Sequence, residues 1–233
     1  MCGRLNVTDN PAVIDLLEVL GVGLSLVSQG VLRQGRFIRA TDTVSIVRHQ
    51  AGQAELALAT WWLLLEPTAD GFKPSSYTSF NTRSDKLLVR GSAGFQAFQS
   101  QRCIVPVSGF GETEGSGKTA RYTDFFGEEA LPLGGLFRRW VHHGTGEERL
   151  SCSVITLPPH PKLIPYHSKA MPLILPRDVC QRWLDPATPL AELTPLLNPW
   201  LPVGLHAQAI DKPSSHQPLG QLDWLEPDQV IAA

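Results

Sequence analysis

The chain has 233 residues, of which 42% are hydrophobic and 18% charged, and its formal net charge is −2. This composition, with six Trp and nine Phe, excludes a disordered chain, and the length allows one large domain or two small ones. No apolar run approaches the length of a membrane span and no signal peptide follows Met1, so we expect a cytoplasmic protein without membrane association.

The predicted elements are short and separated by many turns. A helix is predicted over residues 12–20, with Asn10 as its N-cap and Pro11 as its first residue. Strands are predicted at 43–48, 55–65, 87–89, 103–107, 131–137, 150–157 and 171–175. Further helices are predicted at 177–184 and 190–197, short helical or irregular structure at 85–90 and 94–101, and loops at 111–123 and 213–217.

Strands and long helices do not alternate in this order, which argues against a doubly wound parallel sheet. The sequence therefore predicts a single α+β domain over residues 1–233, with peripheral helices around a strongly bent, mostly antiparallel sheet or open barrel. From Trp183 onward the chain has six acidic residues and one basic residue, Lys212, which gives this segment a net charge of −5, whereas residues 1–182 have a net charge of +3. We therefore expect a mildly basic body over about 1–185, compatible with nucleic acid, and an acidic segment over about 186–233.

Cys2 is the cysteine with the most distinctive chemistry. If an aminopeptidase removes Met1, Cys2 carries both a thiol and a free α-amine, whose ordinary pKa values of ~8.5 and ~7.7–8 leave both partly nucleophilic at neutral pH. With an aldehyde the amine forms an imine, and the thiol then closes a thiazolidine ring. Cys103, Cys152 and Cys180 lie in apolar contexts and are predicted to be core residues, so neither disulfides nor a metal site are expected.

Six short segments give the chain a family resemblance. In order they are MCGR at 1–4, SFNTRSD at 79–85, RCIVPVSGFGE at 102–112, GLF at 135–137, SVIT at 153–156 and HSKAMPLIL at 167–175. The chain resembles the SOS response-associated peptidase (SRAP) family, which processes abasic sites in single-stranded DNA. It departs from the family pattern at Gly111 and Thr113, where aromatic residues are usual, at the inserted Ala170, and at Asp211, where Asn is usual.

The resemblance implies four catalytic residues. The amine of Cys2 would attack C1′ of the ring-opened sugar, and its thiol would close a thiazolidine crosslink. Glu112 would act as general acid and base, His167 would donate to a sugar oxygen, and Asn81 would orient the amine. From the residues alone, Glu112 could equally be a solvated loop carboxylate, His167 a structural histidine and Asn81 a turn residue.

The resemblance also implies a DNA-binding set. Arg4, Arg83 and Lys169 would bind phosphates flanking the lesion. Trp61 is favoured as a platform on which a base stacks, with Trp62 as its alternative, because adjacent residues on a strand face opposite sides. The expected partner is single-stranded DNA containing abasic sites, bound by a monomer that needs no cofactor or metal and associates with the nucleoid when bound.

Two other functions stay open at this point. One is a cysteine-type peptidase or N-terminal nucleophile hydrolase, whose autoprocessing would amount to the loss of Met1. The other is a non-catalytic protein that binds single-stranded DNA. A crosslinking enzyme could also act as a lyase, because its imine is an electron sink for β-elimination of the strand.

Overall fold

Two long, largely buried strands build the centre of the computed structural model, which describes residues 3–8, 11–23 and 30–229. β8 (Arg102–Glu114) and β9 (Arg121–Val141) pair antiparallel along most of their length, and both bend where the register shifts between Val107 and Gly109. A Cβ on Gly109 would lie 2.4 Å from the carbonyl oxygen of Phe125, so only glycine permits this close crossing.

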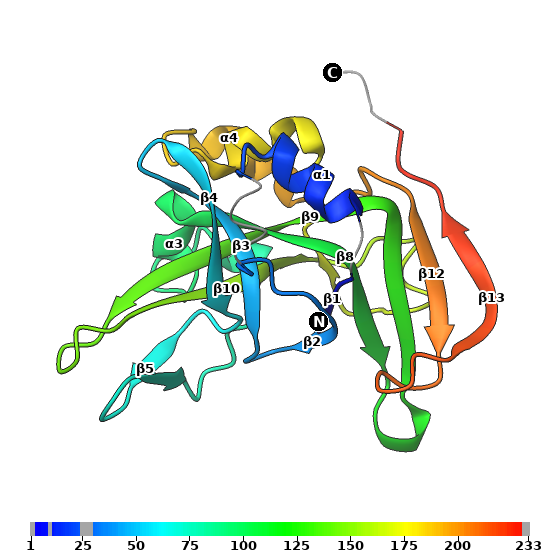
Figure 1. Ribbon diagram of the computed structural model, residues 1–233. Coiled ribbons are helices and arrows are strands. Elements are labelled where there is room, and N and C mark those ends of the chain that lie inside the picture. The colour runs from blue at the N-terminus through cyan, green and yellow to red at the C-terminus, as the bar shows by residue number, and fades with distance from the viewer. Residues whose placement is uncertain (1–2, 9–10, 24–29, 230–233) are drawn as a thin grey trace.

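The remaining strands extend this pair into an eleven-stranded sheet (Figure 1). A ring of pairings runs from β8 through β9, β10, β4 and β3 back to β8. Outside the ring, β1 and β2 follow β8, β12 and β13 follow β9, and β7 and β11 pair with β10. The bounds are β1 (Arg4–Val7), β2 (Gly35–Arg39), β3 (Thr43–Gln50), β4 (Gln53–Thr60), β7 (Asn81–Arg83), β10 (Glu148–Leu157), β11 (Met171–Pro172), β12 (Leu205–Ile210) and β13 (Pro218–Leu225). β5 (Leu65–Pro67) and β6 (Phe72–Pro74) form a separate hairpin.

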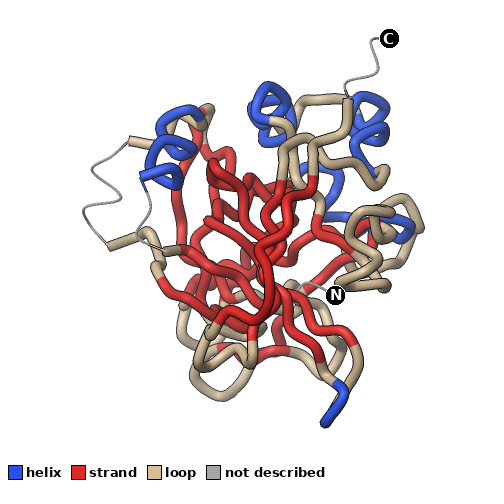
Figure 2. The backbone as a smooth tube through the Cα atoms, turned by 90° about the vertical axis from the view of Figure 1, so that its right-hand side faces the viewer, coloured by secondary structure: helices blue, strands red, loops and turns tan. Residues whose placement is uncertain are grey.

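The helices are short and lie at the periphery of the strands (Figure 2). Among the described residues they are α1 (Pro11–Val19), α3 (Phe95–Ser100), α4 (Cys180–Leu184) and α5 (Leu190–Leu193), with 3₁₀ turns η1 (Ser84–Lys86), η2 (Gly117–Thr119), η3 (Arg177–Val179) and η4 (Thr194–Leu197). Within the described ranges, no helix has the length and apolar character needed to cross a membrane.

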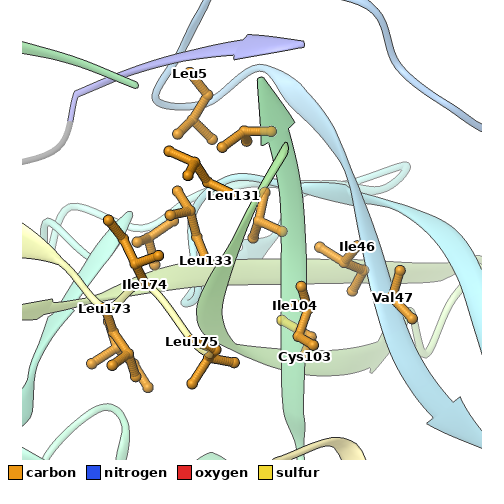
Figure 3. Close-up of a cluster of buried hydrophobic side chains, with 14 of the residues drawn as sticks. Leu5, Ile46, Val47, Cys103, Ile104, Leu131, Leu133, Leu173, Ile174 and Leu175 are labelled. Carbon is orange, nitrogen blue, oxygen red and sulfur yellow. The ribbon is translucent and has the colours of Figure 1, made fainter. Parts of the chain in front are cut away.

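The core is continuous and joins segments far apart in the chain. Figure 3 shows Leu5 of β1, Ile46 of β3, Ile104 of β8, Leu133 of β9 and the 173–175 segment within one apolar cluster. Cys103, Cys152 and Cys180 are buried and free, as predicted. Burial raises the pKa of all three thiols, that of Cys180 to about 12, so they stay protonated and unreactive at neutral pH.

The predicted α+β class, antiparallel pairing and bend are confirmed. The predicted strands at 43–48, 103–107, 131–137 and 150–157 lie within β3, β8, β9 and β10, and the helix over 12–20 is α1, which begins at Pro11. Residue 10, the predicted N-cap, lies outside the described residues. The strand predicted over 55–65 ends at Thr60 as β4, and that predicted over 171–175 keeps only two strand residues.

Two predictions were wrong. Residues 87–89 form a turn after η1, in which Leu88 and Val89 are exposed. Most of the loop predicted over 111–123 is instead the paired ends of β8 and β9, where cross-strand hydrogen bonds compensate for the polar sequence. The acidic segment from 186 onward is also part of the sheet, because it supplies β12 and β13.

Candidate active site

Glu112 is a buried carboxyl group near the end of β8. Alternation along the strand places Glu112 and Glu114 on one face and exposes Thr113 on the other. Glu112 is only 2% exposed, and this burial raises its pKa to about 7, although the charge of Arg4 lowers it. Both protonation states of Glu112 are therefore populated at neutral pH, which suits a group that must accept and return a proton.

His167 faces this carboxyl group from the loop that joins β10 to β11. Its Nε2 lies 3.5 Å from Oε2 of Glu112, and its Nδ1 lies 3.2 Å from Oε2 of Glu114. The side chain is 1% exposed, and burial lowers its pKa to about 4 despite the nearby Glu114 charge. A neutral imidazole is thus held between two carboxyl groups, one buried and one partly exposed.

The His167 loop is held by a hydrogen bond within the loop and by carboxylates of the C-terminal segment. The backbone N–H of His167 donates to the carbonyl of Leu163 (2.9 Å), and Tyr166 donates its hydroxyl to Asp223 (2.7 Å). Earlier in the loop, Lys162 lies 2.8 Å and His160 3.0 Å from Asp228. The acidic segment therefore has a structural role, because its carboxylates hold the loop that presents the histidine.

Arg4 is enclosed beside the same site. Its Nη2 pairs with Asp124 (3.1 Å) and donates to the carbonyl oxygens of Glu112 and Thr123, each at 3.2 Å. The residue is 5% exposed, which contradicts the predicted direct contact with a DNA phosphate. A Cβ on Gly111 would lie 2.3–2.6 Å from the guanidinium, so the absence of an aromatic side chain at 111 makes room for Arg4.

Asn81 and Arg83 lie on β7, which pairs in parallel with β10. The intervening Thr82 turns inward, where its hydroxyl lies 2.7 Å from that of Ser153 and anchors the strand. Asn81 is half-buried, and Arg83 is exposed with a bidentate contact to Asp85 at 2.8 and 2.9 Å. Alternation along the strand thus gives Asn81 and Arg83 a common face.

Arg83 and Lys169 line one cleft of about 430 Å³, together with Asp85, Thr156 and Ala170. Lys169 follows His167 by two residues and is exposed. The cleft thus brings together two of the predicted phosphate-binding cations, from segments 86 positions apart. The inserted Ala170 forms part of its wall.

The two adjacent tryptophans have different environments. Trp61 is fully buried, donates from Nε1 to the carbonyl of Phe80 (2.8 Å) and packs edge-on against that ring. The prediction that Trp61 stacks on a base is therefore wrong. Trp62 is half-buried with its ring 5.7 Å from that of Phe80, so of the two tryptophans it is the alternative residue that keeps some exposure to solvent.

The structure also brings in a residue that the sequence analysis did not single out. Glu114 accepts hydrogen bonds from the backbone N–H (3.1 Å) and the hydroxyl (2.9 Å) of Ser168, the residue after His167. Its spacing of two from Glu112 was the available signal, but the segment was predicted to be a loop, where this spacing has no fixed meaning.

Cys2 lies outside the described residues, so its predicted role stays a prediction. The antiparallel register of β1 on β8 pairs Arg4 with Gly111, Leu5 with Phe110 and Asn6 with Gly109. Because the two strands run in opposite directions, the residues before Arg4 lie nearest to the residues after Gly111 on β8, the first of which is Glu112. The amino end of β1 thus points to the same part of the sheet as the Glu112–His167 pair.

The chain is similar in sequence to a known protein. A frog protein from Xenopus tropicalis, the abasic site processing protein HMCES, is 29% identical over 158 residues, which make up 58% of this chain and 47% of the relative. The match thus spans about half of that protein's length.

Solved structures share the fold at low sequence identity. A protein from Bacteroides thetaiotaomicron superposes with a TM-score of 0.70 at 21% identity, over 91% of this chain and 93% of its own. A protein from Bordetella bronchiseptica gives 0.70 at 19%, over 91% and 100%, and a phage-related protein of that organism gives 0.65 at 20%, over 91% and 95%. The model of the family described as SOS response associated peptidase (SRAP) matches residues 1–213, and the chain therefore belongs to that family.

Proposed function

We propose that this protein processes abasic sites in single-stranded DNA by forming a covalent thiazolidine crosslink through Cys2 after removal of Met1. The observation that carries the proposal is the buried Glu112–His167 pair, at a Nε2–Oε2 distance of 3.5 Å, toward which the amino end of β1 leads. Gly3 alone separates Cys2 from Arg4, and successive Cα atoms are ~3.8 Å apart, so the chain tethers the proposed nucleophile within two residues of Arg4 on β1.

The chemistry matches these groups step by step. The α-amine of Cys2 adds to the C1′ aldehyde, and Glu112 protonates the resulting hydroxyl so that it leaves as water and an imine forms. The thiol then adds to the imine carbon, its proton passes to the nitrogen, and a five-membered ring closes. The net reaction joins aldehyde and aminothiol with loss of one water, and each proton transfer needs a group that titrates near neutrality, as Glu112 does.

The cleft lined by Arg83 and Lys169 offers a surface for the DNA strand. Arg83 and Lys169 are exposed cations in one cleft of about 430 Å³, and both can contact phosphates next to the lesion. Trp62 has a partly accessible ring on which an unpaired base can stack. Asn81 lies two residues before Arg83 on the same face of β7 and would orient the sugar or the amine.

Intact-protein mass spectrometry after incubation with abasic single-stranded DNA tests the proposal. Wild-type protein lacking Met1 should form a heat-stable adduct one water lighter than the sum of the two molecules. Cys2→Ala should form none, and Cys2→Ser, which cannot close a thiazolidine, should form at most an imine that borohydride can trap. A stable adduct with Cys2→Ala, or none with wild type, would refute the crosslink.

Further assays of the same protein distinguish the other candidate functions. Equal retention of abasic and undamaged strands without an adduct would favour a non-catalytic binding protein. Cleavage of the strand beside the lesion, seen on a denaturing gel, would identify β-elimination and hence lyase activity. Proteolysis of an added peptide that depends on Cys2 would favour a peptidase. A monomer without cofactor or metal, acting in the cytoplasm, stays a prediction for sedimentation and localisation experiments.

A further inference from the structure

Glu114 is partly exposed, yet hydrogen bonds to both of its oxygens hold its carboxylate in one orientation. Both of its oxygens are engaged by Ser168, one by the backbone N–H and the other by the hydroxyl. The oxygen that accepts from the backbone is also the one 3.2 Å from Nδ1 of His167. Its orientation is therefore fixed by the residue next to the histidine itself.

We propose that Glu114 is a positioning residue that keeps the proton of neutral His167 on Nδ1, so that the lone pair of Nε2 faces Glu112. A carboxylate next to one ring nitrogen favours the proton on that nitrogen. The other nitrogen, 3.5 Å from Glu112 Oε2, is then left as an acceptor. The inference about the tautomer concerns the protein alone, and its catalytic consequence rests on the proposed function.

The charged groups around the imidazole support this assignment. From β8 come Glu112 and Glu114, whose oxygens lie 3.5 and 3.2 Å from the two ring nitrogens, and from the loop comes Lys169, whose charge opposes protonation of the ring. The backbone of Thr113 favours a protonated ring, but with a partial charge only. Of these groups, Glu114 is the full negative charge at Nδ1, whereas Glu112 lies at Nε2 and carries a proton about half of the time near pH 7.

The tautomer decides whether Glu112 and His167 can exchange a proton. With the lone pair on Nε2, the imidazole can accept a hydrogen bond from the protonated Glu112 carboxyl and can take its proton transiently, and the pKa order of about 7 for Glu112 and about 4 for His167 drives the return of that proton. If the proton were on Nε2 instead, the imidazole would have no lone pair facing the neutral Glu112 carboxyl, and the imidazole could not accept the carboxyl proton. Glu114 thus acts on the reaction through His167 and does not touch the substrate itself.

Nitrogen-15 NMR of the imidazole rings in the DNA-free protein tests the assignment directly. In wild type at pH 7.5, His167 should show a protonated Nδ1 and an acceptor Nε2, the reverse of the form that free histidine prefers. In Glu114→Ala the signals should move toward the Nε2-protonated form. Glu114→Asp should restore part of the wild-type pattern, and Ser168→Ala, which keeps the carboxylate, should change it less than Glu114→Ala.

Crosslinking rates provide the second measurement. Glu114→Ala should slow adduct formation by about 10- to 100-fold, less than the loss of an acid–base group itself (about 10²- to 10⁴-fold), because Glu114 acts through His167. Glu148→Gln, which changes an exposed carboxylate paired with Arg139 on the β9–β10 hairpin, should have no effect. Thermal denaturation checks that each variant is folded, and Ser168→Ala provides the test should Glu114→Ala fail to fold.

The outcomes separate this inference from the proposed function. A wild-type tautomer with Nε2 protonated, or an unchanged tautomer in Glu114→Ala, overturns the positioning role even if crosslinking occurs. A tautomer that switches as expected in a protein that forms no crosslink supports the positioning role and refutes the crosslinking function. Glu114→Ala with wild-type crosslinking rates between pH 5.5 and 8.5 overturns the catalytic consequence.

Discussion

Replacing Glu112 by Gln should stabilise the protein and do so increasingly as the pH rises. The pKa of Glu112 in the folded chain is about 7, against 4.5 for an ordinary glutamate, because burial disfavours the charged form. A raised folded pKa contributes stability that is complete below about pH 4.5 and is lost as the pH rises to 7. Gln keeps the shape and a hydrogen-bond donor but never ionises, so it escapes this loss.

The size of the effect follows from the two pKa values. Their difference, at ~1.36 kcal/mol for each pH unit, corresponds to about 3 kcal/mol of unfolding free energy. The stability of Glu112→Gln relative to wild type should therefore rise by about 2–3 kcal/mol between pH 5 and pH 8. His167, whose pKa is lowered to about 4, destabilises both proteins as the pH falls below 6.5, and this effect largely cancels in the comparison.

Urea denaturation followed by tryptophan fluorescence at pH 5, 6.5 and 8 measures this difference, since Trp61 and Trp183 are buried reporters. Glu129→Gln, at an exposed carboxylate paired with Arg177, is the matched control and should show no pH-dependent gain. If the difference in unfolding free energy between Glu112→Gln and wild type stays constant or falls from pH 5 to pH 8, burial does not raise the pKa of Glu112 to about 7, and the reasoning is refuted.

Three further predictions concern neighbouring residues. Trp61→Ala should lower the free energy of unfolding by about 3–5 kcal/mol, because it empties a core position. Trp62→Ala should fold normally and weaken single-stranded DNA binding by about 1–3 kcal/mol. Urea denaturation and fluorescence anisotropy measure the two effects, and equal losses of stability would contradict the assignment of Trp61 to the core and Trp62 to DNA binding. Gly111→Ala should cost about 1–3 kcal/mol, because the new Cβ would overlap the buried guanidinium beside it; an unchanged denaturation midpoint would count against this packing. Arg83→Ala should reduce the slope of log affinity against log salt by about 0.7 if it binds one phosphate, while Arg149→Ala, a surface residue paired with Glu147, should leave the slope as it is.

The sequence by itself determined the fold class and the family of the chain. Alternating apolar residues in short runs bounded by glycine and proline identified β3, β8, β9 and β10, because strand periodicity is local information. The order of short motifs identified the family and singled out Glu112 and His167, which the structure places 3.5 Å apart. The outer strands β1, β2, β12 and β13, of which β2 and β13 are the edges, were missed because their residues are polar or irregular and pairing with a neighbour stabilises them.

Only the tertiary structure decided which groups are buried and which meet. The polar segment around Glu112 resembles a loop in sequence, yet cross-strand pairing buries its carboxyl group and brings its pKa to about 7. Arg4 and Trp61 have the residue types of a DNA-binding surface, but the paired Asp124 and the carbonyl of Phe80 hold them inside. Arg4 and Asp124 are 120 positions apart and Trp61 and Phe80 are 19 apart, so these contacts depend on how the strands fold together, and no local pattern encodes them. For the same reason Glu114 became part of the site only when the His167 loop was placed beside it.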